Sequence, residues 1–187
     1  MLNINQKEDL KNCLENFCIN PYGFILLSGR NGTGKSFSAR AVYDRLARFK
    51  LPAYDHDDAL FITQVELNLQ WSKQMQSNGD CLYLLDQLSN TKLLVLDDVG
   101  TRTPSEAFMD FLYAISDARF KNKDKVGTII TTNLTSSSMR EKFGDAFVSR
   151  VASGCCFRLE GEDRRFNTLK TNFKDLEAIK MCMPMTR

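Results

Sequence analysis

Several features of exported, membrane-embedded and zinc-binding proteins are missing from this sequence. No apolar run reaches the roughly 20 residues that cross a bilayer, and residues 1–17 show no basic stretch followed by an apolar one, the pattern of a secretory signal. Six cysteines are present, without the paired C-x-x-C spacing of structural metal sites. We therefore expect a cytoplasmic protein with reduced thiols and no membrane partner.

Internal repeats and low-complexity segments are also absent, and the net charge of the 187 residues is only +2. The charge is unevenly distributed, however. Residues 121–187 hold 13 Lys and Arg against 8 Asp and Glu, whereas residues 1–120 hold 12 against 15. This imbalance fits either an ordinary solvated surface or a basic face that lies near phosphates.

Short apolar runs alternate with helical patterns along the chain, which predicts an α/β fold with a parallel sheet of five strands and flanking helices. We expect strands at residues 23–29, 59–63, 92–100, 127–134 and 155–161. We expect helices at residues 7–17, 34–49, 64–77 and 81–89.

A further helix is predicted after the third strand. Thr103 can cap it, Pro104 suits its first position, and Glu106 completes a capping box with Thr103. Its apolar residues then share one face, as expected for a helix packed on a sheet. They are Phe108, Phe111, Leu112, Ile115 and Ala118.

The stretch "SGRNGTGKSFS" contains the pattern G-x-x-x-x-G-K-[ST], between the first predicted strand and the next helix. A chance glycine turn with a surface lysine would not be expected between a strand and a helix. We therefore interpret the stretch as a phosphate-binding loop. Its backbone N–H groups would surround phosphate oxygens, Lys35 would reach the β- and γ-phosphates of ATP, and Ser36 would ligate Mg²⁺. The predicted nucleotide contacts are Gly29, Asn31, Gly32, Thr33, Gly34, Lys35, Ser36 and Phe37.

Polar residues follow two other predicted strands. In "LLVLDDVG", Asp97 would lie beside Ser36 and hold Mg²⁺, and Asp98 would polarise an attacking water. Asp98 could instead be a turn or capping residue. In "TIITTN", Asn133 would orient water or contact the γ-phosphate, although an Asn after a strand is often a turn residue.

Arg150, in "DAFVSRVASG", has no evident local partner. It is either an ordinary surface arginine or a group offered to the γ-phosphate bound by a neighbouring subunit, where it would stabilise the charge that develops during hydrolysis.

These motifs, in this order, resemble the AAA+ ATPases of the DnaC-like helicase loader and IstB-like families. The resemblance runs from about residue 11 to residue 165. It is carried by "GRNGTGKSFSA", "LFIT", "KLLVLDDVGTRTPSE", "FLYAISDARFKNK", "GTIITTNLT", "FVSRV" and "FRLEGEDRR".

The resemblance implies a role for each motif. Lys35 and Ser36 look like the Walker A pair, and Asp97 and Asp98 look like the Walker B carboxylates. The second acid is Asp rather than the Glu of many AAA+ proteins, which suits slow, switch-like hydrolysis. Asn133 looks like sensor 1, and Arg150 looks like the arginine finger. Arg165 matches the last residue of a G-x-S-x-R pattern in which Asp163 replaces the serine.

The resemblance also implies a domain organisation. We expect an ATPase domain over residues 1–165 without a helical lid, followed by a helical tail over residues 166–187. About twenty residues precede the first strand, so the segment with which such loaders grip the helicase would be missing or replaced.

The function indicated is that of a homo-oligomeric ATPase that loads a replicative DNA helicase and engages single-stranded DNA. An IstB-like ATPase that assists a transposase is one alternative. A small P-loop kinase is another, but the segment after the third strand reads as a plain amphipathic helix rather than an arginine-rich lid. An adaptor that binds ATP and scarcely hydrolyses it is a third, left open by Asp98.

Overall fold

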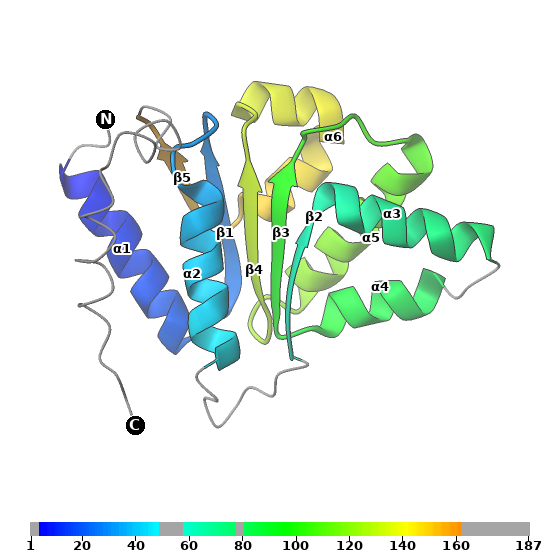
Figure 1. The fold of residues 1–187 in the computed structure, drawn as a ribbon, viewed down its shortest axis with the longest axis horizontal. Helices are drawn as coiled ribbons and strands as arrows, with labels where there is room; N and C mark the ends of the chain where they lie inside the picture. The colour runs from blue at the N-terminus through cyan, green and yellow to red at the C-terminus, as the bar shows by residue number, and fades with distance from the viewer. Residues whose placement is uncertain (1–3, 49–57, 78–80, 162–187) are drawn as a thin grey trace, which may run out of the picture.

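The computed structural model of the protein describes residues 4–48, 58–77 and 81–161. Five parallel strands form one sheet in the order β2-β3-β4-β1-β5, which confirms the predicted fold class (Figure 1). The strands are β1 (Gly23–Gly29), β2 (Ala59–Thr63), β3 (Leu93–Val99), β4 (Gly127–Thr132) and β5 (Cys155–Leu159). The three central strands are mostly buried, as expected for a sheet covered on both faces.

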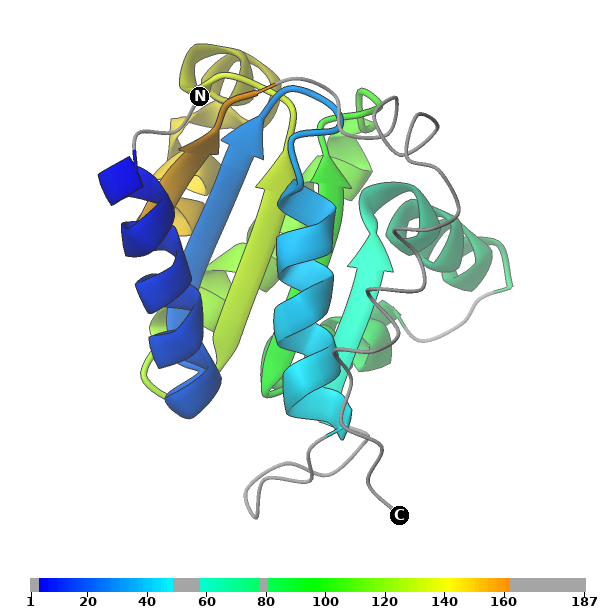
Figure 2. The same ribbon diagram turned by 60° about the vertical axis from the view of Figure 1, so that its left-hand side comes forward.

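Helices cover both faces of the sheet. On one face lie α1 (Ile4–Ile19) and α2 (Lys35–Arg48), as Figure 2 shows. On the other face, side chains of four helices share one apolar core with the sheet. These helices are α3 (Gln64–Gln76), α4 (Cys81–Asn90), α5 (Glu106–Lys121) and α6 (Ser136–Val151).

None of the described helices forms a separate lid, and none is both long and apolar enough to cross a membrane. The predicted tail helix and Arg165 lie outside the described residues.

The predicted start of α5 was wrong by two residues. The cap is Ser105, whose Oγ accepts a hydrogen bond from the backbone N–H of Phe108, and the helix begins at Glu106. Pro104 disfavours helical dihedral angles at Thr103, so the chain stays extended until Ser105. The predicted apolar face is correct, because Phe108, Phe111, Leu112 and Ile115 are buried. A capping box does occur elsewhere, between Thr63 and Glu66 at the start of α3.

Helix α6 was not predicted from periodicity. It bends at Gly144, which has φ 77° and ψ 159°, and its buried residues Met139, Phe143, Phe147 and Val151 recur every four residues. Phe143 and Phe147 stack on each other across this bend, with ring centres 5.2 Å apart.

Arg119 of α5 is completely buried, which is rare for an arginine. Its Nη1 donates to the carbonyl oxygens of Leu88 (2.7 Å) and Thr91 (2.8 Å), at the end of α4. Its Nη2 donates to the carbonyl of Gly127 (2.6 Å) and its Nε to Thr128 Oγ1 (2.8 Å), at the start of β4. One side chain therefore joins three elements.

Candidate functional site

The carboxyl ends of β1, β3 and β4 meet at one edge of the sheet. Thr132, the last residue of β4, is in register with Ser28 of β1 and with Val99 of β3. This register brings together the loop after β1, the acidic pair at the end of β3 and Asn133 after β4. Sequence reasoning predicted this convergence from the strands alone.

The phosphate loop turns sharply directly after β1. Gly29, Gly32 and Gly34 all have positive φ, of 141°, 72° and 99°. At Gly29 an added Cβ would lie 2.1 Å from the carbonyl oxygen of Leu159 in β5. Glycine is therefore required here both by the backbone conformation and by the close approach of β5.

The side chain of Lys35 lies inside the curve of the loop. Its side chain is buried, and its Nζ donates to the carbonyl oxygens of Gly29 and Arg30, each at 2.8 Å. Thr33 is also buried and donates through Oγ1 to the same Arg30 carbonyl at 2.9 Å. These contacts hold the ammonium group inside the curve of the backbone, where an anion surrounded by the loop would meet it.

The other loop residues predicted to contact nucleotide differ in exposure. Ser36 is half-buried at the first turn of α2, while Asn31 is exposed. Phe37 is 79% exposed, and it lines a cavity of about 380 Å³ between α1 and α2. Its ring therefore stands beside the loop rather than in the core.

A β-bulge at the end of β3 gives the two acidic residues different backbone conformations. Leu96 pairs with Ile130 and Val99 pairs with Thr132, so Asp97 and Asp98 together oppose the single residue Thr131. Asp98 takes up the extra residue in the left-handed conformation, with φ 54°. In a regular strand, two consecutive side chains point to opposite faces of the sheet. The bulge interrupts this alternation at Asp97 and Asp98.

Thr131 connects the acidic pair. Its buried hydroxyl donates to Asp97 Oδ1 at 2.5 Å and accepts a hydrogen bond from the backbone N–H of Asp98 at 2.9 Å. Asp97 is buried, whereas Asp98 is exposed. Sequence reasoning missed Thr131, although it stands in the same "TIITTN" motif as Asn133.

Side chains from two helices form hydrogen bonds with the segment that follows the acidic pair. Gln64, buried at the start of α3, accepts from the backbone N–H of Gly100 at 2.6 Å and donates to the Arg102 carbonyl at 3.2 Å. Lys142 of α6 donates to the Gly100 carbonyl at 2.9 Å. Neither Gln64 nor Lys142 was singled out from the sequence, because their partners are distant in the chain.

Asn133 is exposed immediately after β4. Before it, Thr132 donates through its hydroxyl to the Val99 carbonyl at 2.6 Å, and the same hydroxyl accepts from the Leu134 N–H at 3.1 Å. These bonds fix the backbone on both sides of Asn133 at the same edge as the phosphate loop.

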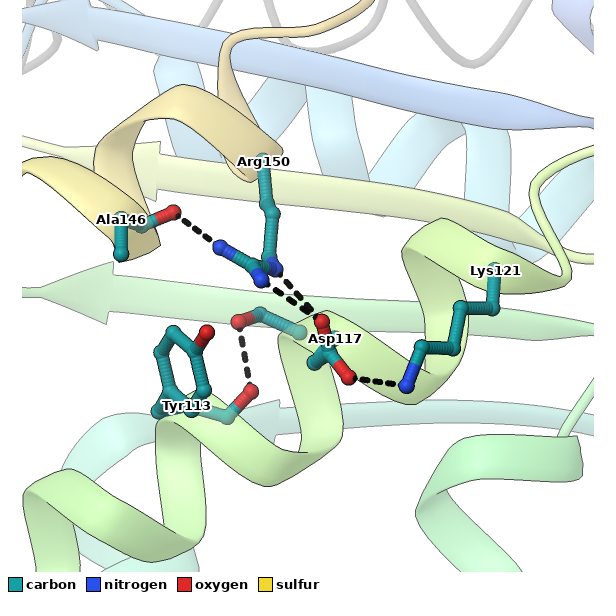
Figure 3. Close-up of polar contacts among 6 residues, drawn as sticks. Tyr113, Asp117, Lys121, Ala146 and Arg150 are labelled. Atoms are coloured by element: carbon teal, nitrogen blue, oxygen red, sulfur yellow. Dashed lines mark hydrogen bonds and ion pairs between the residues drawn. The ribbon is translucent and has the colours of Figure 1, made fainter.

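Arg150 stands apart from this group of residues, near the end of α6. It has partners that the sequence pattern did not reveal. Its Nε and Nη2 lie 2.8 and 2.7 Å from Asp117 Oδ1, and its Nη1 donates to the Ala146 carbonyl at 2.9 Å (Figure 3). Its described contacts include no residue of the phosphate loop.

Comparison with known proteins identifies the family of this chain. The family described as IstB-like ATP binding protein matches residues 8–153. The chain belongs to this family. It is 28% identical over 153 residues to the replicative helicase loader DnaC of Escherichia coli strain K12, covering 81% of this chain and 58% of the relative. The DnaC of Buchnera aphidicola from Schizaphis graminum is 30% identical over 146 residues, covering 77% and 56%. The chain thus spans just over half the length of these relatives.

Solved structures share the fold of this chain. A crystal structure of the DnaC helicase loader aligns with a TM-score of 0.69 at 21% identity, covering 84% of this chain and 92% of that one. AMPPCP-bound DnaA from Aquifex aeolicus aligns with a TM-score of 0.69 at 19% identity, covering 99% and 53%.

Proposed function

We propose that this protein is a DnaC-like loader of a replicative DNA helicase, which binds and slowly hydrolyses Mg²⁺-ATP in a cytoplasmic homo-oligomer and engages single-stranded DNA. One observation carries the proposal. The loop, the acidic pair and Asn133 share one sheet edge, while Arg150 contacts a different part of the molecule. A site of this kind is completed by the arginine of a neighbouring copy.

The residues at the edge fit ATP with Mg²⁺. The loop offers backbone N–H groups, the buried Lys35 ammonium and the start of α2, all of which favour phosphate. Mg²⁺ would take Ser36 and Asp97 as protein ligands, with phosphate oxygens and water completing its shell. Bound there, the ion would neutralise charge on the phosphates.

The remaining side chains have separate tasks in hydrolysis. Asp98, exposed at the bulge, polarises the water that attacks the γ-phosphorus, and Asn133 orients that water. The bond between the γ-phosphorus and the bridging oxygen breaks, which yields ADP and phosphate. Arg150 of the adjacent subunit stabilises the charge that accumulates on the γ-phosphoryl oxygens.

A shared site makes the rate depend on assembly. The ATPase rate per subunit should rise with protein concentration and rise again with single-stranded DNA, and Arg150→Ala should lower it about a thousandfold. The measurement is phosphate release over a range of protein concentrations, with a protein-free reaction as the blank. A rate per subunit that is independent of concentration and of DNA would contradict the oligomeric switch.

Thr131 should determine how well the acidic pair holds Mg²⁺. Thr131→Val keeps the shape but removes the donor to Asp97 and the acceptor for Asp98 N–H. We expect the Mg²⁺ concentration that gives half-maximal hydrolysis to rise about ten- to a hundredfold. Thr131→Ser retains the hydroxyl and is the matched control, so an equal effect of both variants would argue against this role.

The IstB-like family membership also favours a second candidate, an ATPase that assists DNA transposition. The two candidates differ in their partner. ATP-dependent retention of a purified replicative helicase on the immobilised protein would support the loader, and retention of a transposase alone would support the alternative.

A further inference from the structure

Arg150 does not project freely from α6 but is held against α5. Asp117, on the facing side of α5, receives both Nε and Nη2 of Arg150 on its Oδ1. The ring of Tyr113, one turn earlier on α5, lies 4.6 Å from the guanidinium carbon, and the Ala146 carbonyl receives Nη1 at 2.9 Å. Figure 3 shows the guanidinium held by these groups, with the carboxylate between Arg150 and Lys121.

The second oxygen of Asp117 is also occupied. Its Oδ2 lies 2.7 Å from Nζ of Lys121, one turn further along α5. Lys121, followed by Arg150, holds the pKa of the Asp117 carboxyl below its usual range, so the carboxylate is ionised at neutral pH. Each oxygen thus has one cationic partner, and the orientation of the carboxylate is fixed.

The arrangement restrains Arg150 but leaves part of its guanidinium available to another partner. The guanidinium has five N–H groups, and its hydrogen bonds and ion pair with the described residues use three of them. The Arg150 side chain is 22% exposed, so part of the group remains open to a partner. A flexible arginine loses considerable side-chain entropy when it is fixed, and a group already fixed by the fold avoids that cost at the moment of binding.

We propose that Asp117 is a positioning residue that orients Arg150 for the active site of the adjacent subunit. The inference rests on the proposed shared site and names a further part of it. Asp117 would act through Arg150 alone and would contact neither the nucleotide nor the phosphate loop of its own subunit.

Three variants test this assignment by their ATPase rates. Asp117→Ala should lower kcat about ten- to a hundredfold, because a misplaced catalytic group costs that much, while the Kd for ATP stays unchanged. The double variant Asp117→Ala with Arg150→Ala should be no slower than Arg150→Ala alone. Asp110→Ala, an exposed carboxylate on the same helix, should have wild-type kcat.

Mixing of subunits separates positioning from a general structural effect. Lys35→Ala subunits have a defective loop but an intact Asp117 and Arg150. Added in excess, they should restore hydrolysis to Asp117→Ala subunits and equally to Arg150→Ala subunits. If Asp117→Ala lowers the thermal unfolding temperature, Asp117→Asn repeats the test with a side chain of the same size, and an intermediate loss of kcat is expected.

Each other outcome overturns the assignment. A normal or increased rate for Asp117→Ala, with Arg150→Ala inactive, would refute positioning and leave the shared site intact. A double variant slower than either single variant, or a failure of Lys35→Ala subunits to rescue, would show that Asp117 acts independently of Arg150. Full activity of Arg150→Ala would refute the shared site and the positioning role together.

Discussion

Replacing Lys35 with alanine should lower the rate of ATP hydrolysis about a hundred- to a thousandfold while leaving the fold intact. The Nζ of Lys35 is held inside the loop by two carbonyl oxygens, and in the proposed site it would contact the β- and γ-phosphates. Loss of one preorganised charge-stabilising group costs about a hundred- to a thousandfold in rate. Phosphate release under saturating ATP measures the effect.

The control for this variant is Lys73→Ala, which removes an exposed lysine from α3. Circular dichroism and thermal unfolding should give the same folded state for both variants. If Lys35→Ala retained more than a tenth of the wild-type rate, the interpretation of the loop as a site for ATP hydrolysis would be contradicted.

Replacing Arg119 with alanine should have the largest effect on stability. The variant leaves the carbonyl groups of Leu88, Thr91 and Gly127 buried without their donor. Each unsatisfied buried acceptor costs about 1–3 kcal/mol, and a cavity adds to this. We therefore expect the free energy of unfolding to fall by about 4 kcal/mol, a large fraction of the total stability of a typical single domain.

Urea denaturation of the wild type, Arg119→Ala and Arg102→Ala would measure this effect. Arg102 has an exposed side chain in the segment after β3, so its variant should change the free energy of unfolding by less than about 0.5 kcal/mol. If Arg119→Ala cost no more than Arg102→Ala, the three joined elements would have to be held by other contacts.

Local sequence patterns predicted the sheet and the phosphate loop well. "GFILLSG" and "ALFIT" coincide with β1 and β2, because short apolar runs bounded by turns are typical of buried parallel strands. The placement of the acidic pair and Asn133 at one edge followed from the parallel topology. These predictions needed no contact between distant side chains.

The features that sequence patterns did not reveal depend on tertiary contacts. Arg150 has no evident local partner in the sequence, and its partner Asp117 is 33 residues earlier, on a helix that the sequence does not place against α6. Thr131 was overlooked because its role depends on a bulge that a strand pattern does not reveal. The burial of Arg119 is equally invisible in sequence, because arginines are mostly exposed.

The strand order also determines when the phosphate loop can form. β1 is made early, but its neighbours in the sheet, β4 and β5, come about 100 and 130 residues later, as the pairs Gly23 with Gly127 and Ile25 with Cys155 show. Such distant pairings are slow to close. On the ribosome, β1 and its glycines therefore emerge long before the strands that flank them, and a chain that stops before β5 lacks the carbonyl against which Gly29 turns. The nucleotide site belongs among the last parts of this protein to be completed, although its motif lies near the start.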